Sequence, residues 1–262
     1  MGPERDAEIR EEVKAQFGRR AEAYAQSRPH ALGDSLDLMV AWGEAKPFHL
    51  VLDVATGAGF TAFAFANRAR WVIATDITAA MLHQASRLAS ERGLQNVDFQ
   101  FAQAEALPYR DGSFDLVTCR IAPHHFMSVP RFLEEARRVL KEGGVLIVAD
   151  SSSPEDPETA RWQQEVERLR DPSHGKNYSP SEWKQMVEEA GFTLERFTTE
   201  HRTHLVFSDW VRTSGSPPEV VEELRERFRR APEMVREAFQ IRFEGEEIRF
   251  SWLLTIFLAR KA

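Results

Sequence analysis

The chain has 262 residues, of which 42% are hydrophobic and 29% charged, so it can bury a sizeable core and is neither a disordered tail nor a collagen-like chain. Its 34 basic and 41 acidic residues give a formal charge of −7, a balance that argues against general nucleic-acid binding, which depends on neutralising phosphates. The single cysteine, Cys119, excludes an internal disulfide and a metal site built from several cysteines.

The N-terminal segment, residues 1–45, is charged and has no apolar signal core. No uninterrupted apolar run in the chain approaches the roughly 20 residues that a membrane span requires, so we expect a cytoplasmic protein without a membrane span. The segment is expected to form an N-terminal helical lid, because apolar residues recur at steps of three or four. These residues are Ile9, Val13, Phe17, Ala21 and Tyr24. A plain capping helix over one sheet edge is the alternative.

Residues 46–150 alternate between apolar strands and helices. The strand candidates are LVLDVATG from Leu50, WVIATD from Trp71, VDFQFAQA from Val97, FDLVTCRIA from Phe114 and VLIVAD from Val145. A helix expected over residues 130–144 ends in a two-glycine turn. This alternation predicts βαβ units and a mostly parallel sheet with helices on both faces.

Residues 151–262 are expected to complete the sheet. Two further strands are predicted over residues 192–202 and 247–261, and a helix follows the N-cap Ser179. Between the two strands lies a helical insertion at about residues 203–246, far longer than a normal connection. We expect the lid, the core and this last segment to form one globular unit.

The turn DVATGAG, residues 53–59, joins the first strand to the first helix of the core. Small residues allow backbone N–H groups to approach a ligand closely, and Asp76 at the end of the second strand can accept hydrogen bonds from both hydroxyls of a ribose. A purely structural turn is the alternative. With Ala62, the turn also fits the glycine pattern of dinucleotide sites. Asp53 would repel a pyrophosphate and favours a ligand with an amino group and a sulfonium.

Four motifs in order carry a resemblance to a known family. DVATGAG, Asp76, AQAEALPYRDGSFDLV (residues 102–117) and RVLKEGGVLIVAD (residues 138–150) resemble the class I S-adenosylmethionine-dependent methyltransferases, within them the type-11 group similar to the quinone-biosynthesis C-methyltransferases. The resemblance covers roughly residues 10–200. It implies an α/β, Rossmann-like, seven-stranded and mostly parallel sheet with an antiparallel last strand, helices on both faces, and S-adenosyl-L-methionine as cofactor.

The resemblance also implies which residues bind the cofactor. They are Tyr24, Asp53, Ala55, Thr56, Gly57, Gly59, Asp76, Ile77, Met81, Gln103, Ala104, Glu105 and Arg120. Asp53 and the turn that follows it would hold the methionine part, and Asp76 would take the ribose hydroxyls. Arg120, just past the fourth strand, would present its backbone to the methionine amino group.

Ile77 and Met81 would pack near the adenine, and residues 103–105 would form the loop at its edge. The chain departs from the family pattern at two of the implied positions. Many relatives have glycine in place of Ala55, and alanine is tolerable there if its φ stays negative. Many have aspartate in place of Gln103, whose amide oxygen can still accept a hydrogen bond from the adenine amino group.

The candidate catalytic residues are His124 and His125. In an open α/β sheet the reaction takes place outside the carboxyl ends of the strands, and the segment that follows the fourth strand contains both histidines. A histidine can accept a proton near neutral pH. Adjacent loop side chains usually diverge, so one is expected to face the pocket, and His125 is favoured. A structurally satisfied histidine is the alternative, and no metal site is expected.

Two further segments are expected to enclose the pocket. In similar proteins an F-x-x-x-A-x-x-Y helix folds over the cofactor and excludes water, and Phe17, Ala21 and Tyr24 match that pattern. Ordinary core packing is the alternative for these aromatic residues. The loop 170–174 and the insertion around Trp210 are expected to roof the substrate pocket. A mostly apolar roof with scattered histidines suits a small organic acceptor.

The leading hypothesis is an S-adenosylmethionine-dependent methyltransferase that acts on a small organic molecule. The alternatives are an NAD-dependent oxidoreductase, which the glycine turn and Asp76 also fit, and a non-catalytic protein that binds S-adenosylmethionine. The expected partner is a small-molecule methyl acceptor, not a nucleic acid, and a homodimer is left open. Carbon, hydroxyl, amine and carboxylate acceptors all remain open.

Overall fold

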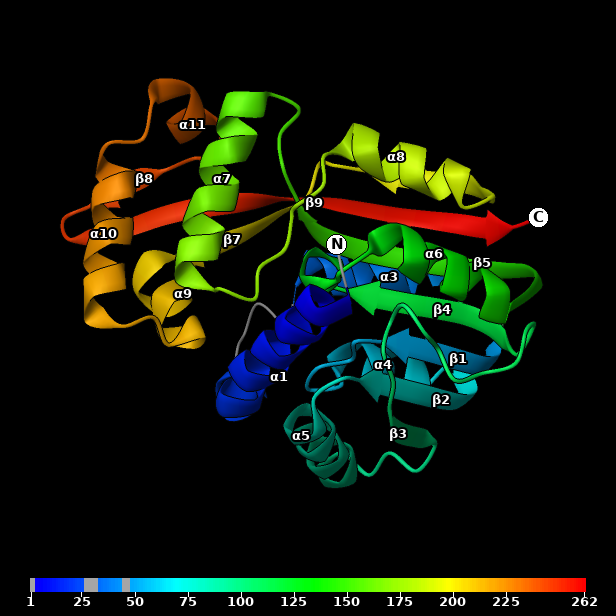
Figure 1. The fold of residues 1–262 in the computed structure, drawn as a ribbon. Coiled ribbons are helices and arrows are strands. Elements are labelled where there is room, and N and C mark those ends of the chain that lie inside the picture. Colours follow the sequence, from blue (N-terminus) through cyan, green and yellow to red (C-terminus); the bar gives the residue numbers. More distant parts are fainter. Residues whose placement is uncertain (1–2, 26–32, 44–47) are drawn as a thin grey trace.

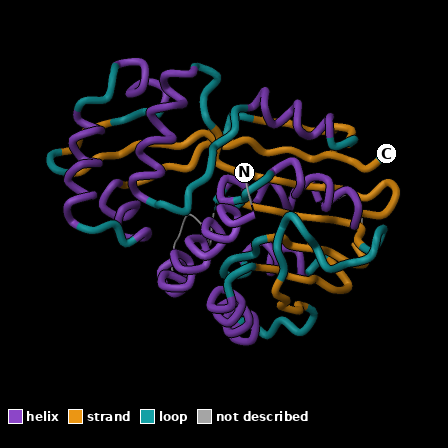
Figure 2. Tube along the Cα trace, in the orientation of Figure 1, coloured by secondary structure: helices purple, strands orange, loops and turns teal. Residues whose placement is uncertain are grey.

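A sheet of nine strands runs through the computed structural model, which describes residues 3–25, 33–43 and 48–262 (Figures 1 and 2). The strands are β1 (Phe48–Val54), β2 (Ala69–Asp76), β3 (Val97–Phe101), β4 (Phe114–Arg120), β5 (Leu140–Ser152), β6 (Phe192–Thr198), β7 (Arg202–Val206), β8 (Arg242–Glu244) and β9 (Glu247–Lys261). The main order is β3-β2-β1-β4-β5-β9-β6, with β1 to β5 parallel and β9 antiparallel to its neighbours. The predicted Rossmann-like α/β fold is confirmed.

Two strands were not expected from the sequence. The prediction of one strand over residues 192–202 and of an all-helical insertion is wrong, because the segment 202–206 forms β7 and the segment 242–244 forms β8. Both pair with the first half of β9, whose 15 residues extend beyond the edge of the parallel sheet. The long strand therefore supplies hydrogen-bond partners that no local pattern in these short segments could reveal.

The helices cover both faces of the sheet. They are α1 (Pro3–Ala25), α3 (Asp34–Gly43), α4 (Phe60–Ala66), α5 (Ala79–Glu91), α6 (Val129–Val139), α7 (Pro157–Arg170), α8 (Pro180–Glu189), α9 (Phe207–Ser214), α10 (Pro218–Arg229) and α11 (Glu233–Ala238). Helix α6 ends five residues earlier than expected, because Leu140–Gly144 already extends as β5 beside β4. None of the helices in the described ranges is both long and apolar enough to cross a membrane.

Three hydrophobic cores hold these layers together. One on each face of the sheet contains fully buried side chains such as Trp183 on one face and Phe65 on the other. The third contains Phe207, Phe228 and Trp252, and it lies within what we call the cap, formed by α7, β7, α9, α10, α11, β8 and the first half of β9. Figure 1 shows the cap on the left, with α1 lying diagonally between α9 and α5.

Candidate active site

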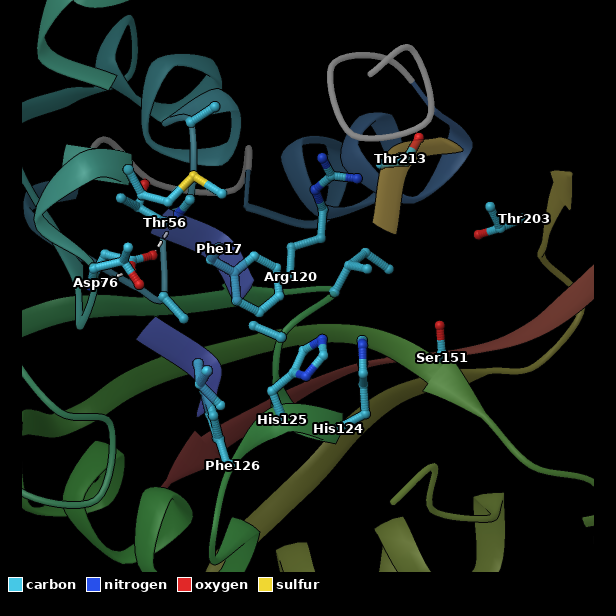
Figure 3. A pocket seen from close by; sticks show the side chains of 18 of the residues that line it. Phe17, Thr56, Asp76, Arg120, His124, His125, Phe126, Ser151, Thr203 and Thr213 are labelled. Carbon is cyan, nitrogen blue, oxygen red and sulfur yellow. Dashed lines mark hydrogen bonds between the residues drawn. The ribbon is translucent and has the colours of Figure 1, made fainter. Parts of the chain in front are cut away.

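A cavity of about 710 Å³ lies at the carboxyl edge of the parallel strands, between the sheet, α1 and the cap. Its volume is typical of a small-molecule site. In Figure 3, Thr56 and Asp76 lie at one end, Thr203 lies at the other, and His124 and His125 point into the space between them. We call these two regions the turn end and the cap end.

The turn between β1 and α4 is held in an uncommon backbone conformation. Ala55, Gly57 and Gly59 have φ angles of 54°, 52° and 93°, all in the left-handed region. A Cβ built on Gly59 would lie 2.4 Å from the ring of Phe63, whereas one built on Gly57 would meet no atom within 4 Å. The condition under which alanine would be tolerated at position 55, a negative φ, is therefore not met, and Ala55 bears left-handed strain where the chain reverses to enter α4.

Asp53 lies behind this turn rather than on the cavity wall. The residue is 1% exposed, and its carboxyl group accepts hydrogen bonds from the hydroxyls of Thr56 (2.5 Å) and Thr118 (2.7 Å). Burial raises the pKa of Asp53 to about 6, although these two bonds and the charge of Arg120 act to lower it. Asp53 thus holds the turn in its conformation, so that it can affect a bound ligand only indirectly, by positioning the turn.

Asp76 lines the turn end directly. One carboxylate oxygen accepts the backbone N–H of Gly57 (2.9 Å), and the other accepts that of Thr78 (2.8 Å). Burial raises the pKa of Asp76, while the backbone hydrogen bonds oppose the shift. Each oxygen keeps a further lone pair, so the group can still accept two hydroxyl donors from a ligand.

The remaining residues expected near the adenine separate into two groups. Ile77, Met81, Ala104 and Glu105 line the cavity, as does Ala102, which sequence reasoning missed. Gln103 lies between lining residues but is not itself part of the wall.

The two histidines have different electrostatic surroundings. His124 Nδ1 lies 2.7 Å from Asp150 Oδ1, and since a carboxylate has no proton to give, Nδ1 donates. Burial alone would lower the pKa of His124, but the attraction of Asp150 outweighs it and raises the pKa. His125 Nδ1 instead donates to the Ser173 carbonyl (3.1 Å). Burial, with the nearby His124, lowers the pKa of His125 to about 3, so this ring is neutral at physiological pH.

Of the loop 170–174, which was expected to roof the pocket, Arg170 lines the cavity, whereas residues 171–174 do not. The segment 171–177 packs against the two histidines instead. The backbone N–H of Gly175 donates to the carbonyl of His124 (2.9 Å), and a Cβ on Gly175 would lie 3.0 Å from that oxygen. The His174 ring lies 5.4 Å from that of His124 and bonds to Gln164 (3.0 Å). Among the described residues, no group of three or more His, Cys, Asp or Glu side chains could hold a metal ion.

Helix α1 reaches the histidines and the cap. Phe17 meets the His125 ring edge to face, with the ring centroids 4.9 Å apart, and it also lines the cavity. The Gln16 amide donates to the Ser214 carbonyl of α9 (3.0 Å). Tyr24 belongs to α1, but its side chain is outside the described residues. The helix therefore covers the middle of the cavity, where the sequence placed a lid.

Arg120 enters the cavity with its side chain. Its guanidinium donates to the hydroxyls of Thr61 (3.2 Å) and Ser35 (3.3 Å), and all three residues line the wall. The sequence argument had placed only the backbone of Arg120 at the site. Thr61 and Ser35 were missed because no local pattern distinguishes them, and only the packing of α3 against α4 brings them to the cavity.

The cap end combines aromatic and charged side chains. Trp210 and Trp252 form apolar wall, and the Arg170 guanidinium lies 4.9 Å from the Trp210 ring. Arg170 also approaches Glu167 at 3.4 Å, and both side chains are largely buried. Thr203 adds a hydroxyl. This end can therefore enclose a small molecule with an apolar body and a few polar groups.

Comparison with known proteins identifies the family. Residues 49–191 match a family model described as a methyltransferase domain. The chain is 36% identical over 236 residues to the uncharacterized methyltransferase YcgJ of Bacillus subtilis, covering 89% of this chain and 93% of that protein. The chain belongs to the methyltransferases.

Solved structures and a second relative agree with this membership. The YcgJ crystal structure superposes with a TM-score of 0.80, at 34% identity over 87% of this chain and 97% of YcgJ. The Bacillus halodurans protein BH2331 gives 0.83, at 36% identity over 87% of this chain and 99% of that one. The ubiquinone/menaquinone biosynthesis C-methyltransferase UbiE of Hydrogenovibrio crunogenus is 38% identical over 120 residues, 44% of this chain and 47% of UbiE.

The family decides between the hypotheses left open by the sequence. The protein is an S-adenosyl-L-methionine-dependent methyltransferase, and the NAD-dependent oxidoreductase alternative is wrong. The turn end of this methyltransferase fits that cofactor. Space in front of Gly57 leaves the backbone open to a ligand, and Asp76 presents a carboxylate to the same space.

Proposed function

We propose that this methyltransferase acts on a small organic acceptor bound at the cap end of the cavity, with His124 as the base. The observation that carries the proposal is the buried contact between His124 and Asp150 at 2.7 Å, at the wall of a cavity of about 710 Å³. The cavity has the volume of a small-molecule site, which favours a small acceptor over a macromolecular one. The proposal includes a cytoplasmic location, in keeping with a chain whose single cysteine forms no internal disulfide.

The cofactor is proposed to lie at the turn end. Asp76 would accept the ribose hydroxyls, because its two oxygens are already oriented by backbone N–H groups. Ile77 and Met81 would pack on the adenine, and the turn 55–59 would hold the methionine part. When bound, S-adenosyl-L-methionine supplies a methyl group on a sulfonium that is already activated for displacement.

His124 is proposed to remove the proton of the acceptor. Its Nδ1 donates to Asp150, which leaves Nε2 as the nitrogen that can take a proton. A raised pKa makes the neutral form of His124 the stronger acceptor of the two histidines. The acceptor atom would take the methyl group that the bound cofactor supplies, and S-adenosylhomocysteine would be the other product. The acceptor proton then resides on His124, and Asp150 stabilises the resulting imidazolium.

His125, which the sequence favoured as the base, is proposed to act in its neutral form. Its Nδ1 proton is committed to the Ser173 carbonyl, so Nε2 can accept a hydrogen bond from the acceptor and orient it. Phe17 packs against the same ring and would exclude water from the reacting atoms.

The proposal is tested by supplying the enzyme with methyl-labelled S-adenosylmethionine and a deproteinised metabolite extract. We expect label in a small-molecule product, and a large loss of that product with His124→Ala. S-adenosylhomocysteine should still bind this variant, since His124 is not placed among the cofactor contacts. Parallel reactions with protein and RNA fractions serve as the comparison. Label that enters only those fractions would contradict a small acceptor.

A further inference from the structure

We propose that Glu167 forms a subsite for a hydrogen-bond donor of the methyl acceptor, an ammonium, N–H or hydroxyl group, and that it disfavours a carboxylate or phosphate at the same place. This inference rests on the proposed function, because it requires a small acceptor at the cap end of the cavity. Glu167 has no part in the proton transfer proposed above, so the subsite adds the chemical class of the acceptor to that proposal.

Glu167 faces the cavity from the last turn of α7. Gln163 lies one turn earlier on the same face of this helix, and its amide donates to the Ser152 carbonyl of β5 (3.4 Å). That face is therefore directed at the end of β5, where Ser151 lines the cavity. Glu167 also lines the cavity and is 6% exposed. Its carboxylate is thus a buried group of the cavity wall rather than a surface charge.

The Glu167 carboxylate has hydrogen-bonding capacity that the protein leaves unused. Among the residues that the structure describes, none donates a hydrogen bond to it, and its polar contact is an ion pair between Oε2 and Arg170 Nε at 3.4 Å. A carboxylate can accept about four hydrogen bonds. Buried polar groups are normally hydrogen-bonded, so a carboxylate that lines a cavity without protein donors is suited to the donors of a ligand.

The charges around Glu167 favour a donor over an anion. The Arg170 guanidinium lies between two carboxylates, because its Nη2 is also 3.9 Å from Oδ2 of the fully buried Asp171. This guanidinium can balance the charge of one of the two carboxylates but not of both. A carboxylate or phosphate placed beside Glu167 would therefore be repelled, whereas an ammonium or a neutral donor would not.

Binding of the acceptor makes the requirement for a donor stricter. Solvent can hydrogen-bond to the carboxylate before the acceptor binds, but an acceptor that displaces this solvent must supply a donor itself. Otherwise the carboxylate is left buried and unpaired, which penalises the wrong molecule strongly. Trp210 and Trp252 line the same end of the cavity and offer apolar contact. The expected acceptor therefore combines an apolar body with a donor group bound by Glu167.

The test uses three small probes that share a benzene ring, namely benzylamine, benzyl alcohol and benzoate. Each is titrated into protein saturated with S-adenosylhomocysteine, and binding is followed through the NMR signals of the Trp210 and Trp252 indole N–H groups, which report on the cap end. We expect benzylamine to bind at least about tenfold more tightly than benzoate, with benzyl alcohol between them.

Two substitutions separate the charge of Glu167 from its ability to accept a hydrogen bond. Glu167→Gln should weaken benzylamine binding by about tenfold, because the charge is lost, and leave the affinity for benzyl alcohol within about threefold, because the amide oxygen still accepts. Glu167→Leu should weaken the binding of both probes, since it removes the acceptor altogether.

Glu165→Gln is the matched control. Glu165 lies on the same helix, is exposed, pairs with Arg227 (3.1 Å) and does not line the cavity, so its substitution removes the same charge without touching the subsite. It should leave all three affinities unchanged. Benzoate that binds as tightly as benzylamine, an unchanged benzylamine affinity in Glu167→Leu, or indole signals that no probe shifts would overturn the subsite. The proposed function fails by a different result, the absence of a labelled small-molecule product from the extract.

Discussion

Replacing Asp76 with alanine tests the proposed ribose contact, because this carboxylate has a double role. It faces the cavity, and its oxygens accept the backbone N–H groups of Gly57 (2.9 Å) and Thr78 (2.8 Å). Asp76→Ala would remove both proposed bonds to the ribose hydroxyls and release the turn at Gly57.

The expected loss follows from the charge on the acceptor. A hydrogen bond to a charged group contributes about 1.5–3 kcal/mol, and water that enters the space left by the side chain recovers part of it. Loss of two such bonds should reduce the binding free energy of S-adenosylhomocysteine by about 3 kcal/mol, which weakens its affinity on the order of a hundredfold. We expect a weakening of at least about tenfold. Asp76→Asn should lose less, because its amide keeps one acceptor oxygen while its NH₂ opposes one backbone N–H.

The assay is calorimetric titration of each variant with S-adenosylhomocysteine, after circular dichroism has shown that the variant is folded. Asp98→Ala is the matched control. Asp98 lies on the neighbouring strand β3, where its carboxylate accepts the Trp71 indole N–H outside the cavity. An affinity of the folded Asp76→Ala variant within about threefold of the wild type would refute the ribose contact.

Four further outcomes are expected at the turn and the histidines. Ala55→Gly should raise the melting temperature by a few degrees, because it relieves about 1 kcal/mol of left-handed strain; an unchanged or lower value would show that Ala55 is not strained. Gly59→Ala should destabilise the fold by about 2 kcal/mol or more in urea unfolding, because its Cβ would lie 2.4 Å from a phenylalanine ring of α4, and full stability would contradict that contact. The fold lowers the pKa of His125 to about 3, so the unfolded chain gains this proton first and stability should fall below about pH 6.5, by up to about 1.4 kcal/mol per pH unit. This fall should be smaller in His125→Gln, and an identical pH dependence would remove His125 as its source. Asp150→Asn should lower the pKa of His124 in an NMR titration, and an unshifted pKa would show that Asp150 does not control it.

The parallel part of the fold could be predicted because local and long-range signals agree there. Apolar runs that alternate with helical periods place β1 to β5 within a few residues. The cap was less predictable because β7 and β8 are short and exist through pairing with β9. The sequence predicted helix α6 to be too long, because helix-forming residues continue past Val139. In the structure Leu140 pairs with Phe114 of β4 and so belongs to the sheet.

The site was predictable to the extent that its residues follow strand ends. Asp76 and the glycine turn could be placed from the sequence, since the carboxyl ends of parallel strands share one edge. The unequal roles proposed for His124 and His125 could not be predicted from the sequence, because Asp150 lies 26 residues after His124 along the chain. The contact of Arg120 with Ser35 spans 85 residues and is likewise a product of tertiary packing.

A crystal structure of the protein with S-adenosylhomocysteine would test the cofactor placement most directly. The account predicts ribose hydroxyls on Asp76 and the sulfur facing the space beside His124. A nucleoside bound at the cap end, or one with its ribose turned away from Asp76, would contradict it.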